Sequence, residues 1–348
     1  RNLRMETLFF YFLRRGLWET EEEYKGSKAI GPEDWERLFA MAHEQAVTGW
    51  LIDGVGRTAM RPARNVWEQW LFHLLYLEQM NRLAERCGQQ WLERLEKAGM
   101  PAFVFKGTSV ALWYQQPLHR SPGDVDVVLK DGWSRLKPML AEAGIAFRDE
   151  NGDIVVQENE RVPVELHARW EYVYNPVVNA RLQRLCKEAD ETDRELYLVC
   201  LMLHLRRHFL TYGIGLKQVC DVAVMLRHAE LDGKKVAILL KRLHVERFGR
   251  ILFGFIENYI GGTEAYPLKP VRRGKGAELF RNVVLRDGYR LKMEREEKAR
   301  NMRFRISRIV GNAWFWVRRG WTLLGIMPGE VMSFLVYKAG KRIFRHGK

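Results

Sequence analysis

The chain has 348 residues, of which 47% are hydrophobic and 29% are charged, and this balance excludes an intrinsically disordered protein. The net charge is +14, and most of the excess lies in residues 301–348, which argues against nucleic acid tracking through a site earlier in the chain. The four cysteines lie far apart without a C-x-x-C pair, which argues against a disulfide framework or a cysteine zinc site and favours buried thiols in a reducing compartment.

The sequence contains neither an expected membrane-spanning segment nor an expected signal peptide. No run of 18 or more apolar residues occurs, so a membrane-spanning helix is not expected. The first residues lack the small-residue cleavage site of a signal peptide. These features predict a cytoplasmic protein of one large domain or two smaller ones.

Residues 1–98 are predicted to be helical. Pro32, Glu33 and Asp34 form an acidic helix start, and apolar residues then recur at nearly helical spacing. A second, longer run has an apolar residue every three or four positions and ends at Gly99, a typical helix stop. The sequence therefore begins with an N-terminal helical region.

The pattern changes at Met100, where short apolar runs replace helical spacing. Such runs predict buried strands at 101–107 and 125–130. Alternating apolar and polar residues predict three further strands, with a hairpin turn near Gly152 between the first two of them. These strands are 145–150, 153–158 and 162–168, and the predicted intervening helices are 108–116 and 132–144.

Beyond Arg169 the chain returns to helical patterns, up to a Pro-, Gly- and charge-rich segment at 263–276 that is the best linker candidate. The predicted helices lie at 196–210, 215–229, 234–245 and 248–262. The fold class is predicted to be α+β, with a small mixed β-sheet core embedded in a mostly helical chain. The predicted parts are 1–98, an N-terminal helical region; 99–170, the αβ core; 171–262, a helical domain closing the cleft; and 263–348, a linker and a basic, aromatic helical tail.

Three acidic residues form a candidate metal site. Asp124 and Asp126 lie two positions apart at the start of a predicted strand, where alternate side chains share one face. Two carboxylates this close repel each other unless a cation lies between them, and Mg²⁺ takes such oxygen ligands in phosphate chemistry. Glu165 would complete the cluster if its strand lies beside that of Asp126. Alone, a D-x-D pair also occurs as a surface-facing pair.

A glycine turn and two basic residues form a candidate phosphate site. Gly107 follows a strand and opens a helix, a turn that exposes backbone N–H groups where a phosphate could rest. Lys106 and Arg120 could neutralise charge on a triphosphate, with arginine offering a bidentate fork. Two alternatives stay open, which are solvation of Lys106 at a strand end and a structural salt bridge from Arg120 to the aspartate pair.

Three segments resemble a family of uncharacterised nucleotidyltransferases in the polymerase-β-like superfamily: FVFKGTSVALWYQQPLHRSPGDVDVVL, VELHARW and HLRRHFLTYGIGLKQVCDVAVML. The family is common in bacterial surface-polysaccharide gene neighbourhoods, and the resemblance covers roughly residues 30–230. The superfamily has a Gly-Ser or Gly-Gly turn, a D-x-D motif on the next strand and a third acid on a later strand. The resemblance implies that these positions are taken by Gly107 and Thr108, by Asp124 and Asp126, and by Glu165.

The sequence has two departures from the superfamily pattern. Lys106 precedes the glycine, a feature of this particular family, and Thr108 takes the place of the second Ser or Gly of the turn. The gap of 17 positions from Gly107 to Asp124 is also longer than usual. The resemblance implies transfer of a nucleoside monophosphate from a triphosphate such as ATP, with Mg²⁺ (two ions) or Mn²⁺ held by the acids. Glu165 would bind the second metal or act as general base. The acceptor stays open among a sugar phosphate or other small molecule, a protein hydroxyl and a nucleic acid end.

Four further residues are candidates for a substrate cleft. His167 follows Glu165 by two positions and should share its face. His204 and His208 lie four apart on a predicted helix, but the glutamate of an H-E-x-x-H motif is missing, which disfavours a zinc pair. Two interpretations of these histidines stay open. They either contact a substrate in a cleft near His167 and Asp221, or they pack in a core.

The C-terminal tail mixes Trp, Phe and Leu with Arg and Lys, which suits contact with an anionic membrane surface and a peripheral location at the inner membrane face. Packing of the tail aromatics onto the helical domain is the competing interpretation, and nucleic-acid binding lacks a recognised motif. The family resemblance implies polysaccharide biosynthesis as the setting. Two rival functions remain open, a non-catalytic nucleotide-binding scaffold with a membrane-surface tail and a toxin-like nucleotidyltransferase acting on protein or tRNA.

Overall fold

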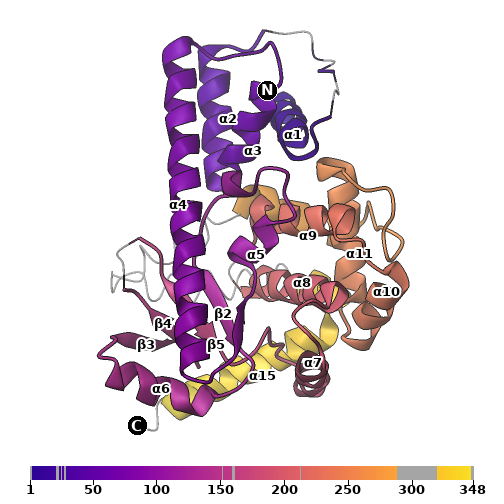
Figure 1. The fold of residues 1–348 in the computed structure, drawn as a ribbon. Helices are drawn as coiled ribbons and strands as arrows, with labels where there is room; N and C mark the ends of the chain where they lie inside the picture. The colour runs from indigo at the N-terminus through magenta and orange to yellow at the C-terminus, as the bar shows by residue number, and fades with distance from the viewer. Residues whose placement is uncertain are drawn as a thin grey trace. The chain divides into compact units, whose positions relative to one another are not determined.

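The structure is a computed structural model that describes residues 2–20, 23–24, 26, 29–150, 152–158, 161–211, 213–287 and 320–345 (Figure 1). The chain forms two compact units, Arg1–Trp170 and Glu171–Lys348. They are called the first unit and the second unit below. The predicted division of the chain into four parts stays a prediction.

The first unit begins with helices, as predicted for residues 1–98. They are α1 (Asn2–Trp18), α2 (Pro32–Glu44), α3 (Thr48–Gly56) and α4 (Arg64–Lys97). Two glycines bring the backbones of α1 and α3 into contact. A Cβ on Gly16 would lie 1.8 Å from the carbonyl oxygen of Trp50, and one on Gly54 would lie 1.8 Å from that of Phe12. No side chain larger than a hydrogen atom therefore fits at either position.

A five-stranded mixed sheet follows, in the order β1-β2-β5-β4-β3. Its strands are β1 (Ala102–Val104), β2 (Val125–Leu129), β3 (Phe147–Glu150), β4 (Asp153–Val156) and β5 (Val164–His167). β2 and β5 pair in parallel, and the other pairings are antiparallel. The five predicted strands are confirmed, including the hairpin between β3 and β4, and the predicted α+β fold class is correct.

Short helices connect these strands. They are α5 (Gly107–Ala111), the 3₁₀ turn η1 (Pro117–His119) and α6 (Trp133–Glu142). The helix predicted at 108–116 is shorter than expected. The backbone N–H groups of Trp113 and Tyr114 each donate to a carbonyl three residues back, so the α-helix tightens into turns before Pro117.

Strand alternation gives the sheet one apolar face and an opposite face on which polar side chains lie beside apolar ones such as Val128 and Val155. The apolar face packs against α4 and α6 in a buried core (Figure 1). It is formed by Val125, Val127, Leu129, Ile154, Val156, Val164 and Leu166. The residues between them, among them Asp126, Glu165 and His167, therefore lie on the opposite face. The apolar core thus fixes where these polar side chains are placed.

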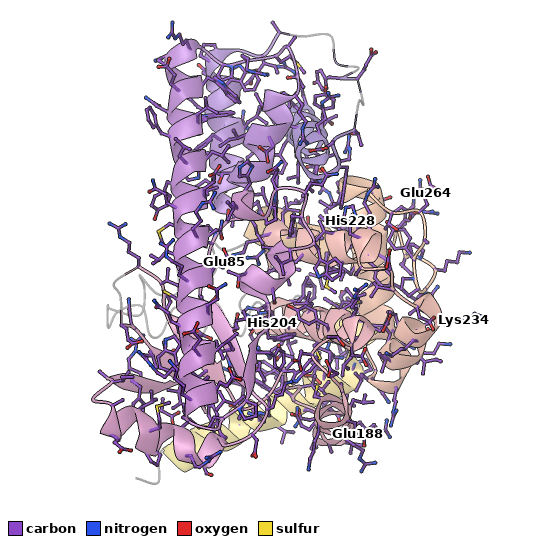
Figure 2. The ribbon with its side chains drawn as sticks, in the orientation of Figure 1. Glu85, Glu188, His204, His228, Lys234 and Glu264 are labelled. Carbon is purple, nitrogen blue, oxygen red and sulfur yellow. The ribbon has the colours of Figure 1, made fainter. Side chains whose placement is uncertain are left out.

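The second unit is helical in its described residues, as predicted for the region beyond Arg169. Its elements are α7 (Pro176–Glu188), α8 (Arg194–Thr211), α9 (Leu216–His228), α10 (Gly233–Arg242), α11 (Glu246–Phe255), η2 (Ile256–Ile260), α12 (Lys275–Asn282), η3 (Val283–Asp287), a helix at 320–326 and α15 (Pro328–Arg345). The four helices predicted from the sequence are confirmed, with the last of them split into α11 and η2. Exposed charges such as Glu188, Lys234 and Glu264 mark the outer surface of this unit (Figure 2).

The segment predicted as a linker, residues 263–276, is irregular up to the start of α12 but lies against α11. The backbone N–H of Val271 donates to the carbonyl of Arg250 at 2.7 Å, and Arg272 pairs with Glu257. Among the residues that the structure describes, no helix is long and apolar enough to cross a membrane.

His119 joins three elements of the first unit and provides a pH-dependent contribution to stability. Its Nδ1 lies 2.8 Å from Asp53 of α3, and its Nε2 lies 3.2 Å from Glu78 of α4. Burial alone would lower the pKa of His119, but hydrogen bonds and charge from the two acids outweigh burial and raise it above 6.5. Protonated His119 is therefore favoured in the folded state.

We expect His119→Gln to lower the free energy of unfolding by about 1.5–3 kcal/mol at about pH 6. The contribution is fully present below the unfolded pKa of 6.5 and is lost as pH rises through the raised folded pKa, so the cost should shrink at about pH 9. Urea unfolding of the native and variant proteins at both pH values measures the difference in their free energies of unfolding. Groups that titrate equally in both proteins do not contribute to that difference. An equal cost at both pH values would contradict a charged His119.

Candidate functional site

Two acidic residues from adjacent strands form the centre of the candidate site. Asp126 of β2 and Glu165 of β5 are direct partners in the parallel register. Their side chains therefore leave the sheet side by side on the face opposite the apolar core. Asp126 is buried, as all of β2 is, and Glu165 is partly buried. A third carboxylate can join the D-x-D motif only where the strand of Glu165 lies beside that of Asp126, and β2 and β5 are such neighbours.

Asp124 lies at the rim of the same cluster. It precedes β2 by one residue and is exposed, whereas Asp126 lies within the strand and is buried. The prediction that both carboxylates project from one face stays a prediction. The chain is still irregular at Gly123 and Asp124 after the turn. The Asp124 carboxylate nevertheless reaches Glu165. Burial, followed by the charges of Asp124 and Asp126, raises the pKa of Glu165 to about 7.

His167 lies between two carboxylates. Its Nε2 is 2.9 Å from Asp126 Oδ1, and its Nδ1 is 3.1 Å from Asp153 Oδ1 on β4. Burial alone would lower the pKa of His167, but these two hydrogen bonds outweigh burial and raise it to about 9. The imidazolium therefore balances part of the negative charge and orients Asp126. Asp153 is a site residue that sequence reasoning missed, although its place in the hairpin was predicted.

Lys106 points its ammonium group into the cluster. Its Nζ lies 3.6 Å from Asp126 Oδ1, and the side chain is only 12% exposed. The alternative of a solvated lysine at a strand end is therefore wrong. Lys106 has a φ of +65°, in the left-handed region, and Gly107 follows with +46°. This unusual turn directs the lysine side chain back toward β2 instead of along the strand.

The glycine turn is closely packed against the D-x-D segment. A Cβ on Gly107 would lie 3.3 Å from the carbonyl oxygen of Asp124, and a side chain would also be strained at its positive φ. The Ser109 hydroxyl and backbone N–H both donate to the Lys106 carbonyl and close the turn. Thr108 follows Gly107 at the start of α5 and is partly buried.

Arg120 is buried, and its carbonyl accepts a hydrogen bond from the Asn81 side chain at 2.7 Å. Asn81 also donates to the Leu118 carbonyl, so α4 fixes the path of the chain from η1 to the D-x-D segment. The triphosphate role of Arg120 stays a prediction.

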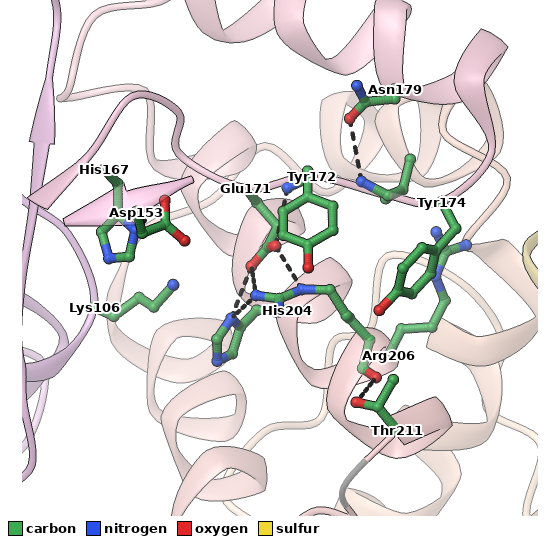
Figure 3. A network of polar contacts seen from close by, with 12 residues as sticks. Lys106, Asp153, His167, Glu171, Tyr172, Tyr174, Asn179, His204, Arg206 and Thr211 are labelled. Atoms are coloured by element: carbon green, nitrogen blue, oxygen red, sulfur yellow. Dashed lines mark hydrogen bonds and ion pairs between the residues drawn. The ribbon is translucent and has the colours of Figure 1, made fainter. Parts of the chain in front are cut away.

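The second unit holds a polar cluster around Glu171, which is 3% exposed (Figure 3). Its carboxylate accepts from Arg207 Nε at 2.9 Å and contacts His204 Nδ1 at 2.7 Å. The Arg207 guanidinium also lies over the ring of Tyr172, 4.5 Å from its centroid. Sequence reasoning missed Glu171 and Arg207. The sequence feature that could have indicated Arg207 is the pair of adjacent arginines in the otherwise apolar helix α8.

The remaining predicted cleft residues also belong to the second unit. The rings of His204 and His208 lie 4.3 Å apart between centroids, and Asp221 is buried in α9. Since His204 is held by Glu171, its orientation is explained by the polar cluster. Contact of His204, His208 and Asp221 with a substrate stays a prediction.

The acidic cluster of the first unit fits a divalent cation. Asp126, Glu165 and His167 each offer a ligand atom, and these atoms lie within 4.8 Å of one another. No other such group of three occurs among the residues that the structure describes. Burial, followed by the charges of Asp124 and Asp126, raises the pKa of Glu165, so a bound cation would stabilise the ionised carboxylate. Carboxylate oxygens suit Mg²⁺ or Mn²⁺. As an imidazolium, His167 would orient Asp126, and only the neutral ring would offer a further ligand.

Residues 31–261 match the model of a protein family described as "Uncharacterised nucleotidyltransferase". The matched region includes the whole acidic cluster of the first unit and helices α7 to α11 of the second. No curated protein and no solved structure matches the chain.

Proposed function

Since the chain belongs to this nucleotidyltransferase family, we propose that it transfers a nucleoside monophosphate from a nucleoside triphosphate to an acceptor with the help of Mg²⁺. The observation that carries the proposal is the pairing of Asp126 with Glu165 in register on neighbouring parallel strands. Two acids placed side by side on a buried sheet face repel each other, and a protein keeps such a pair where a cation is bound.

Asp126, Glu165 and Asp124 are the residues that we propose to hold the metal. When bound, Mg²⁺ would neutralise charge on the triphosphate and lower the pKa of an acceptor hydroxyl. His167, fixed by Asp126 and Asp153, would hold the Asp126 carboxylate in one orientation.

Lys106 and the turn that follows it are proposed to bind the triphosphate. The ammonium group already lies 3.6 Å from Asp126, so a phosphate beside the metal would be within its reach. The backbone of Gly107 and Thr108 would supply N–H donors at the start of α5. Glu165 would either complete the ligand set or accept the proton of the acceptor hydroxyl, and both roles require its carboxylate at this position.

Isothermal titration with each nucleoside triphosphate, in Mg²⁺ and in EDTA, tests this proposal. We expect binding that requires Mg²⁺ and is lost in Asp124→Ala/Asp126→Ala, with the preferred base identified by the tightest ligand. Asp149→Ala is the matched control, because Asp149 is an exposed acid of the same sheet that lies outside the cluster. Failure of the well-folded native chain to bind any triphosphate would reject the proposal.

A turnover assay then separates catalysis from binding alone. Pyrophosphate release is measured with sugar phosphates as the first acceptors, followed by protein and tRNA. Binding without turnover on any of them would favour the nucleotide-binding scaffold over the transferase.

A further inference from the structure

The C-terminal helix α15 presents an apolar face to solvent. Met332, Leu335 and Val336 are 54%, 42% and 70% exposed, and Ala339 continues the same spacing of three and four residues. Residues at this spacing share one side of a helix. These four residues are called the outer face of α15.

The opposite side of α15 is anchored to the second unit, so the direction of the outer face is set. Glu330 is buried and lies 3.4 Å from Arg206 of α8. Its two carboxylate oxygens also accept from the backbone N–H groups of Tyr174 and Asn175, at 2.7 and 3.3 Å. Phe334 is buried against the Tyr174 ring, with 4.9 Å between ring centroids. The outer face therefore cannot pack into the core of this unit.

The outer face of α15 belongs to a strongly basic part of the sequence. Residues 301–348 hold ten lysines and arginines and one acid, and that acid, Glu330, is already paired with Arg206. Lys338 is exposed on α15 itself, and Trp321, on the preceding helix 320–326, is 84% exposed. Apolar and aromatic residues combined with unbalanced positive charge are typical of helices that lie in a membrane interface.

We propose that the outer face of α15 docks the protein on the surface of an anionic lipid bilayer. The apolar stripe enters the boundary between headgroups and acyl chains, and the basic residues of 301–348 attract anionic headgroups. Two weak signals together give stable attachment where either alone gives transient contact. Such docking would set the location of the protein and does not depend on transferase activity.

Charge favours a lipid surface over the other occupants of such a face. Pairing of two copies through α15 would bring two strongly basic tails together, which is unfavourable without a counterion surface. Nucleic acid would satisfy the charge but would leave the apolar stripe exposed to water. An anionic bilayer satisfies both features at once.

Flotation of the full chain with vesicles tests the proposal. We expect binding to mixed phosphatidylcholine–phosphatidylglycerol vesicles that weakens as salt rises, and little binding to phosphatidylcholine alone. Leu335→Asp/Val336→Asp should reduce the bound fraction by at least about tenfold. The matched control is Val177→Asp/Ile238→Asp, which places the same added charge on exposed apolar residues of the second unit outside α15, at 60% and 63% exposure.

The outcomes separate the alternatives. Equal loss of binding in both double variants would mean that net charge alone drives attachment and would overturn the role of the outer face. No binding of the native chain to anionic vesicles would overturn the proposal as well. A native dimer in light scattering that becomes monomeric only in Leu335→Asp/Val336→Asp would assign the outer face to a second copy instead. Thermal unfolding of all variants confirms that they are folded.

Discussion

Asp126→Asn is expected to weaken Mg²⁺-dependent nucleotide binding by at least about a hundredfold, since loss of a residue that merely orients a metal ligand already costs 10–100-fold. The substitution keeps the shape of the side chain but removes the charge that faces Glu165, His167 and Lys106. A divalent cation then has one anionic ligand fewer. The cationic side chains of His167 and Lys106 also lose the negative charge of Asp126 that they share. The affinity for Mn²⁺ alone, followed by electron paramagnetic resonance, gives a readout that needs no acceptor.

The matched comparisons for this prediction lie in the same sheet. Glu165→Gln should weaken Mn²⁺ binding to a similar degree, because it removes the acid paired with Asp126 in register. Asp149→Asn should leave it unchanged, since Asp149 lies on β3 and pairs with the exposed Lys137. If Asp126→Asn, shown to be folded by circular dichroism, bound Mn²⁺ as tightly as the native chain, the metal site would have to be placed elsewhere.

Glu171→Ala is expected to destabilise the protein by about 3–5 kcal/mol, the typical cost of removing one partner of a buried ion pair. The substitution leaves the Arg207 guanidinium without its bidentate partner and His204 without its Nδ1 contact. It also removes the acceptor for the Tyr172 backbone N–H. Chemical unfolding with an intrinsic fluorescence readout measures the loss.

Two further variants show whether charge is the cause. Glu171→Met/Arg207→Met removes both charged partners together, and we expect it to recover a large part of the lost stability, because apolar residues of similar size often replace a buried ion pair at little cost. Glu257→Ala breaks an exposed pair with Arg272 in the same unit and should have a far smaller effect. A mild effect of Glu171→Ala, equal to that of Glu257→Ala, would contradict the importance of this cluster.

Much of the fold could be predicted because local patterns determine it. The apolar runs at β1, β2 and β5 and the alternation at β3 and β4 identified all the strands. The parallel register that places Asp126 beside Glu165 could only be hypothesised, since 39 positions separate them and no local signal sets the pairing. The D-x-D spacing also gives no indication that the two aspartates differ in burial. Asp124 precedes β2 and is exposed, whereas Asp126 is buried.

The residues that sequence reasoning missed depend on contacts distant in the chain. Asp153 is a site residue only because β4 lies beside β5, which brings it to His167. Glu171 meets Arg207 and His204 from more than 30 positions away, and a lone acid after a strand gives no pattern that predicts this. The direction of Lys106 follows from its positive φ, a backbone conformation that non-glycine residues rarely adopt.

The mixed pairing of the sheet has a consequence for how the protein folds. The β3–β4 and β4–β5 ladders join segments close in sequence, whereas the parallel β2–β5 ladder must close a much longer loop. Loop closure entropy makes such a ladder slow to form, and this one also brings two like charges together at Asp126 and Glu165. The candidate site is therefore expected to assemble in the last steps of folding. If the proposed cation binds at Asp126 and Glu165, it should accelerate refolding of the chain as well as stabilise the native state.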